Sequence, residues 1–172
     1  NQLEDRMIRM QPFEVEFHSG DRVQFEVFNQ VEDLKDDFEI SDGVVLPAGI
    51  RYEWTRYQVR ASAASKRPVS GSVEYSGGDF WDGTRREVNF EVNVRPRPGI
   101  SVQLASEYND VVLPEGAFIT RLYRMDARTQ FSPWMSLSNN LQYDSQSGNL
   151  GWQLRFRWIQ KPGNDIFFVW TQ

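Results

Sequence analysis

Apolar and polar side chains alternate along most of the chain, which is typical of β-strands whose two faces meet different surroundings. The pattern is clearest in "LGWQLRFRWIQKPGNDIFFVW", residues 150–170. In its first half, one parity holds Leu, Trp and Phe, and the other holds Gln and Arg. A soluble sheet with one wet face and a membrane barrel with a polar lumen both require this period of two. The stretch therefore predicts a strand and leaves its surroundings open.

The same alternation recurs from Phe13 onward and predicts about ten antiparallel strands joined up and down. Many of them have room for the roughly 9 to 11 residues that a tilted membrane strand needs. We therefore predict an all-β fold, an antiparallel up-and-down meander closed as a barrel or strongly curved. A chain of 172 residues suits one domain, residues 1–172.

The connections between the predicted strands alternate between short turns and longer loops. The short turns are residues 18–21, 65–68, 95–99, 131–134 and 160–164, and the longer loops are 30–49, 76–84, 109–117 and 144–149. In a meander this alternation places all short turns at one end of the sheet. The long loops are rich in Asp and Glu and the short turns in Lys and Arg, so one end is predicted to be acidic and the other basic.

A weak internal repeat is also visible. "VVLPAG" at residues 44–49 recurs as "VVLPEG" at residues 111–116, and each copy is followed by proline-containing turns. The repeated units would be residues 23–101 and 102–165, as in a barrel that grew by adding hairpins. Shared turn chemistry alone could produce much of the same match.

The two parities of the best-patterned strands predict two surfaces. The apolar parity is expected to face lipid or a protein partner, and its clearest members are Val88, Phe90, Val92, Leu154, Phe156 and Trp158. The opposite parity is expected to form a polar network inside a wet lumen, with Glu87, Glu91, Arg155 and Arg157 as members. The alternative is a one-layer or sandwich sheet whose polar face is simply solvated.

Composition narrows the classes of function. The formal net charge is −5 and no basic run is longer than a pair, so nucleic acid is not an expected partner. The longest apolar run, Ile166 to Trp170, is far shorter than a membrane-spanning helix, so any membrane span must be a strand. The chain has no cysteine and begins at Asn1 without a signal-peptide pattern.

Residues for catalysis are scarce. His18 is the only histidine and lies in a predicted turn, which rules out a catalytic triad and a multi-histidine metal site. We predict no catalytic, cofactor or metal site and no enzymatic activity. The six tryptophans lie mostly near predicted strand ends, as in the aromatic girdles of membrane barrels. Glycan binding on exposed rings stays an unsupported alternative.

The region from Phe131 to Trp170 also carries a resemblance, through "FSPW", "NLQYDSQSGNLG", "RFRW" and "PGNDIFFVW". It resembles the C-terminal part of a domain-of-unknown-function family found in large envelope proteins of Gram-negative bacteria. There the domain commonly follows a carbohydrate-binding module similar to family nine, which this chain lacks. The resemblance implies an outer-membrane-type β-barrel region. Because the chain ends at Thr171 and Gln172 rather than on an aromatic residue, it predicts a fragment or a shortened relative of a larger barrel.

Together these features predict a non-enzymatic, membrane-associated β-barrel-type protein of the cell envelope, with a structural or transport-scaffold role. Its expected place is the outer membrane or a periplasm-facing membrane surface, and its expected partner is the membrane or a membrane-protein complex. One alternative is an extramembrane accessory β-sheet subunit that docks on a larger membrane complex through the same apolar face. Another is a carbohydrate-binding envelope module.

Overall fold

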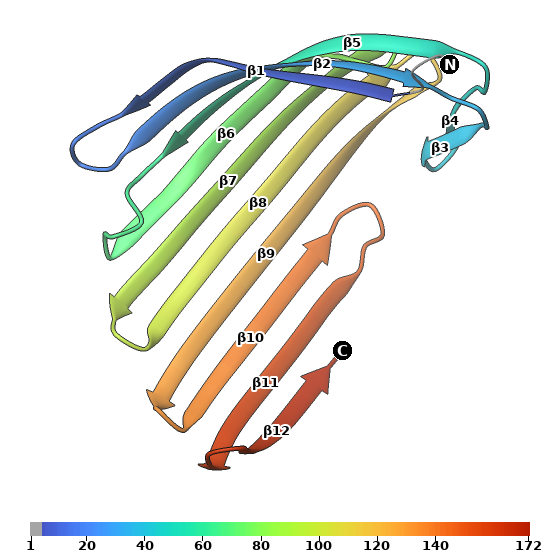
Figure 1. Ribbon diagram of the computed structural model, residues 1–172. Coiled ribbons are helices and arrows are strands. Elements are labelled where there is room, and N and C mark those ends of the chain that lie inside the picture. Colours follow the sequence, from blue (N-terminus) through green and yellow to red (C-terminus); the bar gives the residue numbers. More distant parts are fainter. Residues whose placement is uncertain (1–4) are drawn as a thin grey trace.

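Ten strands form one antiparallel sheet in the computed structural model, which describes residues 5–172. They pair in chain order, except that β2 pairs directly with β5 because β3 and β4 form a separate hairpin (Figure 1). The strands are β1 (Asp5–Glu16), β2 (Arg22–Asp33), β3 (Phe38–Ser41), β4 (Val44–Leu46), β5 (Arg51–Ser62), β6 (Val69–Phe80), β7 (Gly83–Arg97), β8 (Ile100–Leu113), β9 (Gly116–Ser132), β10 (Met135–Asp144), β11 (Leu150–Lys161) and β12 (Asn164–Thr171). The prediction of an all-β, ten-strand antiparallel meander is confirmed.

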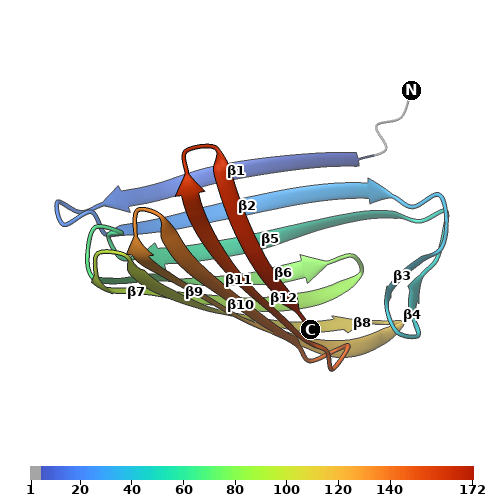
Figure 2. The same cartoon turned by 90° about the horizontal axis from the view of Figure 1, so that it is seen from below.

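The sheet is open. β1 pairs only with β2 and β12 only with β11, so the two edge strands do not meet. The sheet twists across its width instead, and Figure 2 shows β11 and β12 crossing the direction of β1 and β2. Such twist is the default of adjacent strands, whereas closure also needs a matching shear between the edges. The prediction of a closed barrel or strongly curved sheet is wrong for this structure.

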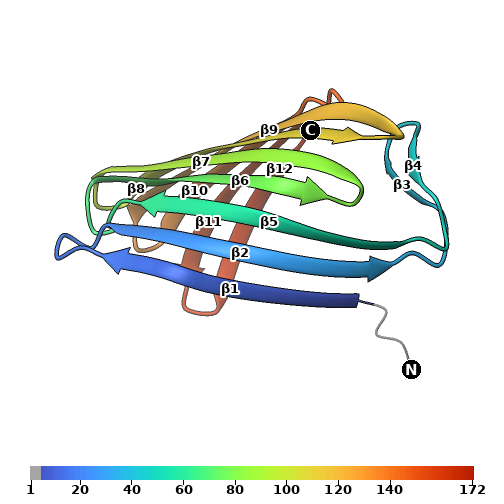
Figure 3. The ribbon, with the colours of Figure 1, turned by 90° about the horizontal axis from the view of Figure 1, so that it is seen from above.

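The main cluster of buried side chains lies at one end of the sheet, under the β3–β4 hairpin (Figure 3). Leu46 of the hairpin is completely buried, and Trp54 and Trp81 stack beside it with ring centroids 4.9 Å apart. The other buried members are Val44, Tyr52, Val111 and Leu113. Val111 and Leu113 come from the second copy of the repeated motif and Val44 and Leu46 from the first, so both copies contribute to one core.

The loops differ from the prediction in two places. Residues 76–84 and 109–117 were predicted as long loops, yet β6 and β7 are joined by residues 81–82 alone, and β8 and β9 by residues 114–115 alone. Only the 34–50 connection is long, and it contains the β3–β4 hairpin. The lengths of the connections therefore do not alternate strictly between short and long. Successive connections still lie at opposite ends of the sheet, as they must in a meander.

Glycines explain why the stretch "SGGD" continues as a strand. Gly78 has φ +140°, and a Cβ placed on it would lie 2.5 Å from the carbonyl oxygen of Thr55 on β5. A larger residue would push β5 and β6 apart. Gly78 therefore allows close pairing of β5 and β6 and does not mark a loop.

Candidate functional site

The strand register places the predicted apolar residues on one face of the sheet. Val88, Phe90 and Val92 lie on β7, while Leu154, Phe156 and Trp158 lie on β11, and the paired positions across β8 to β10 connect the two sets. Phe90 is 51% exposed, and Val88 and Trp158 are also exposed. The six residues therefore lie on one face, and that this face meets lipid or a partner stays a prediction.

This face carries a continuous surface that we call the apolar belt. On each strand of the sheet the belt occupies the middle and the part toward the short turns, and none of its positions is charged. It comprises Met10, Phe13 and Val15 of β1; Val23, Phe25 and Val27 of β2; Tyr57, Val59 and Ala61 of β5; Val69, Gly71, Val73 and Tyr75 of β6; Val88, Phe90, Val92 and Val94 of β7; Val102, Leu104, Ser106 and Tyr108 of β8; Tyr123, Met125 and Ala127 of β9; Leu137, Asn139, Leu141 and Tyr143 of β10; Leu150, Trp152, Leu154, Phe156 and Trp158 of β11; and Ile166, Phe168 and Trp170 of β12.

Tyrosines mark the limit of the belt toward the loop end. Five of the six tyrosines of the chain lie on this boundary: Tyr57, Tyr75, Tyr108, Tyr123 and Tyr143. The boundary steps along the strands, because Tyr75 pairs with Val59, two residues from Tyr57, and Tyr123 pairs with Ser106, two residues from Tyr108. A stepped row is what a level boundary produces on tilted strands.

Charges begin directly beyond the tyrosines. Arg86, Asp110 and Arg121 lie on the same face one pair farther toward the loops, and Arg121 stacks over the ring of Tyr108 at 5.6 Å. At the other end of the belt, exposed rings of Phe17, Phe131 and Trp134 lie at or beside the short turns. The belt is therefore flanked by aromatic rings at both ends and by charges beyond the tyrosine row.

The one amide in the belt is paired locally. The indole Nε1 of Trp152 donates a hydrogen bond of 2.5 Å to the Oδ1 of Asn139 on the neighbouring strand. A polar side chain that faces an apolar medium costs less when such a bond satisfies it. The pair therefore removes much of the polarity of this spot.

The opposite, polar face carries ion pairs, which are most enclosed near the hairpin core. The Glu87 carboxylate accepts hydrogen bonds from Arg56 on β5 and contacts Arg85, each at 2.9 Å. The side chains of Arg56 and Glu87 are each only 15% exposed. Asn89 also donates to Glu87, at 2.9 Å. One carboxylate thus holds β5 and β7 together across β6.

The structure does not bring the four predicted members of the polar network together. Glu87 and Glu91 lie on β7, and Arg155 and Arg157 lie on the same face of β11, with β8, β9 and β10 between them. Arg157 instead pairs with Asp165 of β12 at 2.6 Å, and Arg155 stacks over the ring of Phe167 at 4.5 Å. The alternating sequence pattern correctly placed all four residues on one face. Which side chains pair with one another depends on the order of the strands in the sheet.

Two tryptophans differ from the predicted girdle. Trp54 and Trp81 are 4% and 8% exposed and belong to the core under the hairpin, so neither lies at a membrane interface or on a glycan-binding surface. Their neighbours Phe80 and Phe118 pack against the same core. The sequence motif connected with this core is "VVLPAG" at residues 44–49. Its alternate residues Val44 and Leu46 lie on the hairpin that covers the two tryptophans.

Chemical inventory adds little to these surfaces. His18 is exposed in the β1–β2 turn. Residues 5–172 contain no group of three or more His, Asp or Glu side chains placed to hold a metal ion, and no helix in this range is long and apolar enough to cross a membrane. The absence of catalysis and of cofactors stays a prediction.

Comparison with known proteins gives no match: no protein-family model, curated protein or solved structure is similar to the chain. The resemblance to an envelope-protein family therefore stays a prediction. The apolar belt is the feature on which a functional assignment has to rest.

Proposed function

We propose that this chain is a non-enzymatic, membrane-associated β-sheet protein of the cell envelope, with a structural or transport-scaffold role. In this proposal the apolar belt faces lipid and the polar face lines a wet interior. One observation supports it above all: the belt is free of charge on every strand of the sheet and ends at a row of tyrosines. Outer-membrane-type barrels have this arrangement on their lipid-facing side.

The height of the belt agrees with a membrane. From Leu150 to Trp158 the belt extends eight steps along β11, or about 26 Å at the usual rise per residue. A tilt of about 40° reduces this to about 20 Å, close to the roughly 25 Å apolar band of membrane barrels. Many of its apolar side chains are exposed, and contiguous exposed apolar patches mark sites that contact a membrane or a protein.

The two unpaired edges of the sheet place a requirement on its position in a membrane. Unpaired backbone groups cost several kcal/mol each in hydrocarbon, so an open sheet edge does not persist there. In the membrane, β1 and β12 would both need strand partners, from a second copy or from other strands. The proposal therefore describes the sheet as part of a barrel wall in the outer membrane.

A second candidate function uses the same surface differently. As an accessory subunit, the sheet would dock its apolar belt onto a larger membrane-protein complex. The open edges and a mean hydropathy of −0.58 favour this reading. A carbohydrate-binding module has less support, because Trp81 is buried and the exposed rings are spread along the sheet.

Partition into protein-free lipid vesicles separates these candidates, with Phe156→Glu as the test variant and Gln153→Glu as its control. Both substitutions add one carboxylate to β11, the first on the belt and the second on the polar face. We expect the parent and the control to resist a carbonate wash. An unpaired charge on the lipid side costs about 2 kcal/mol, so Phe156→Glu should weaken insertion about thirtyfold. Release of the parent itself by carbonate would contradict the proposal and favour the accessory subunit.

A further inference from the structure

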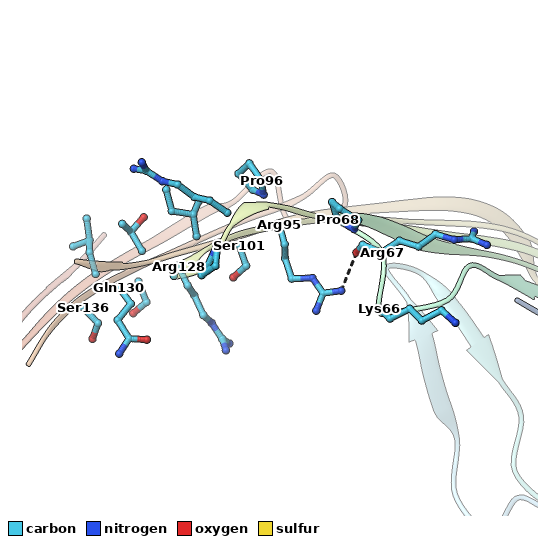
Figure 4. A pocket seen from close by; sticks show the side chains of 16 residues that line it. Lys66, Arg67, Pro68, Arg95, Pro96, Ser101, Arg128, Gln130 and Ser136 are labelled. Atoms are coloured by element: carbon cyan, nitrogen blue, oxygen red, sulfur yellow. Dashed lines mark hydrogen bonds between the residues drawn. The ribbon is translucent and has the colours of Figure 1, made fainter. Parts of the chain in front are cut away.

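The polar face is hollowed at the short-turn end of the strands. The hairpin core lies on the same face at the opposite end. One hollow of about 640 Å³ is lined by the β5–β6 and β7–β8 turns together with β9 and β10 (Figure 4). A second, of about 350 Å³, lies over β9, β10 and β11. Arg128, Ser136 and Ser138 line both, so the two hollows form one continuous surface.

Strand register gathers three arginines in the second hollow. Ser138 of β10 pairs with Arg128 of β9 on one side and with Arg155 of β11 on the other. Ser136, two residues away on the same face, pairs with Arg157. The two serines therefore share one face with the three arginines, and the Ser138 hydroxyl donates a hydrogen bond of 3.4 Å to the backbone carbonyl oxygen of Arg155.

Two of the three arginines in the second hollow have no carboxylate partner in the described part of the chain. No Asp or Glu lines either hollow. Arg157 has a carboxylate partner, Asp165, but Arg128 and Arg155 form no ion pair with any residue in the described range 5–172. The ring of Phe167, on the same face of β12, lies against the Arg155 guanidinium with its centroid 4.5 Å from Cζ.

The adjoining hollow extends the same charge. Lys66, Arg67 and Arg95 lie along it, and Arg95 donates a hydrogen bond of 3.0 Å to the carbonyl oxygen of Arg67 (Figure 4). Arg67 also pairs with Asp21 at 2.8 Å. Basic side chains thus continue from the arginine cluster to the short turns.

We propose that Arg128, Arg155 and Arg157, with Ser136 and Ser138, form a binding site for a phosphate group on a water-borne ligand. Guanidinium groups bind phosphate oxygens through paired, charge-assisted hydrogen bonds, and the Ser136 hydroxyl supplies a further donor. The site lies on the face opposite the apolar belt, which favours a ligand that arrives from water over a lipid headgroup. The phosphate site rests on the register and charge of the polar face, while the choice of a water-borne ligand rests on the proposed function, in which the belt faces lipid.

The test is calorimetric titration of the full chain, in uncharged detergent, with inorganic phosphate at constant ionic strength. Arg128→Gln and Arg155→Gln are the test variants, and Arg124→Gln is the control, since it removes the same charge from the same face of β9. All three arginines are exposed, so circular dichroism should show that each variant keeps the fold. We expect saturable binding that each test variant weakens about tenfold and that the control leaves nearly unchanged.

Three results would overturn the assignment. The first is the absence of saturable phosphate binding, and the second is equal weakening by Arg124→Gln, which would indicate a general charge effect. The third concerns the source of the phosphate group. If micelles that contain phosphatidic acid displace phosphate from the parent, the site binds a lipid headgroup and the water-borne ligand is wrong.

Discussion

Leu46 carries the sharpest prediction about stability, because it is the one side chain of the described core that is fully buried. Leu46→Ala removes three carbon atoms from the contact between the β3–β4 hairpin and the aromatic cluster of β5, β6 and the β6–β7 turn. Transfer of these atoms to water costs about 2.4 kcal/mol at about 0.8 kcal/mol per carbon. The cavity left behind raises the expected loss to about 2–5 kcal/mol.

Val45→Ala is the matched control. Val45 is the next residue on the same strand and is 41% exposed, so its truncation should cost under about 1 kcal/mol. Urea unfolding in detergent, followed through the summed fluorescence of the six tryptophans, which include the buried Trp54 and Trp81, measures both losses. Equal destabilisation by the two variants would refute the claim that the hairpin anchors the core.

Two further predictions concern ion pairs. Glu87→Gln should lower the free energy of unfolding by about 1–3 kcal/mol, because Arg56 and Arg85 would lose their shared, largely enclosed carboxylate; a thermal melt that matches the parent would contradict this. Hydrogen bonds from Arg67, the Ala64 amide and Ser19 lower the pKa of Asp21 from 3.8 to about 2. Its stabilisation is therefore present above pH 3.8 and lost as the pH falls through about 2, and Asp21→Asn should flatten the melting temperature across this window.

The alternating pattern predicted the strands and the two faces of the sheet with success, as β7 and β11 show. A period of two reports which residues share a face, and "EVNFEVNV" and "WQLRFRW" keep that period without interruption. The apolar candidates on these strands followed directly. The local pattern was sufficient to assign the faces, because successive side chains of an extended chain point to opposite faces of the sheet.

Other features depend on contacts between distant residues, which the pattern does not contain. Gly78 resembled a loop residue because its close approach to Thr55 is visible only once β5 and β6 pair. Trp81 resembled a girdle residue because the hairpin that covers it comes from residues 38–46. The partners of Arg157 and Glu87 likewise follow from strand order, and whether the edges meet depends on accumulated twist.

The most direct test of the account is a scan of probe accessibility along β7 in lipid vesicles. The chain has no cysteine, so single cysteines at positions 88–93 can each carry a polarity-sensitive fluorophore without a background signal. We expect doxyl-labelled lipids to quench the probes at 88, 90 and 92, and aqueous iodide to quench those at 89, 91 and 93. Quenching by iodide at all six positions, with none by lipid, would contradict the claim that the apolar belt faces the membrane.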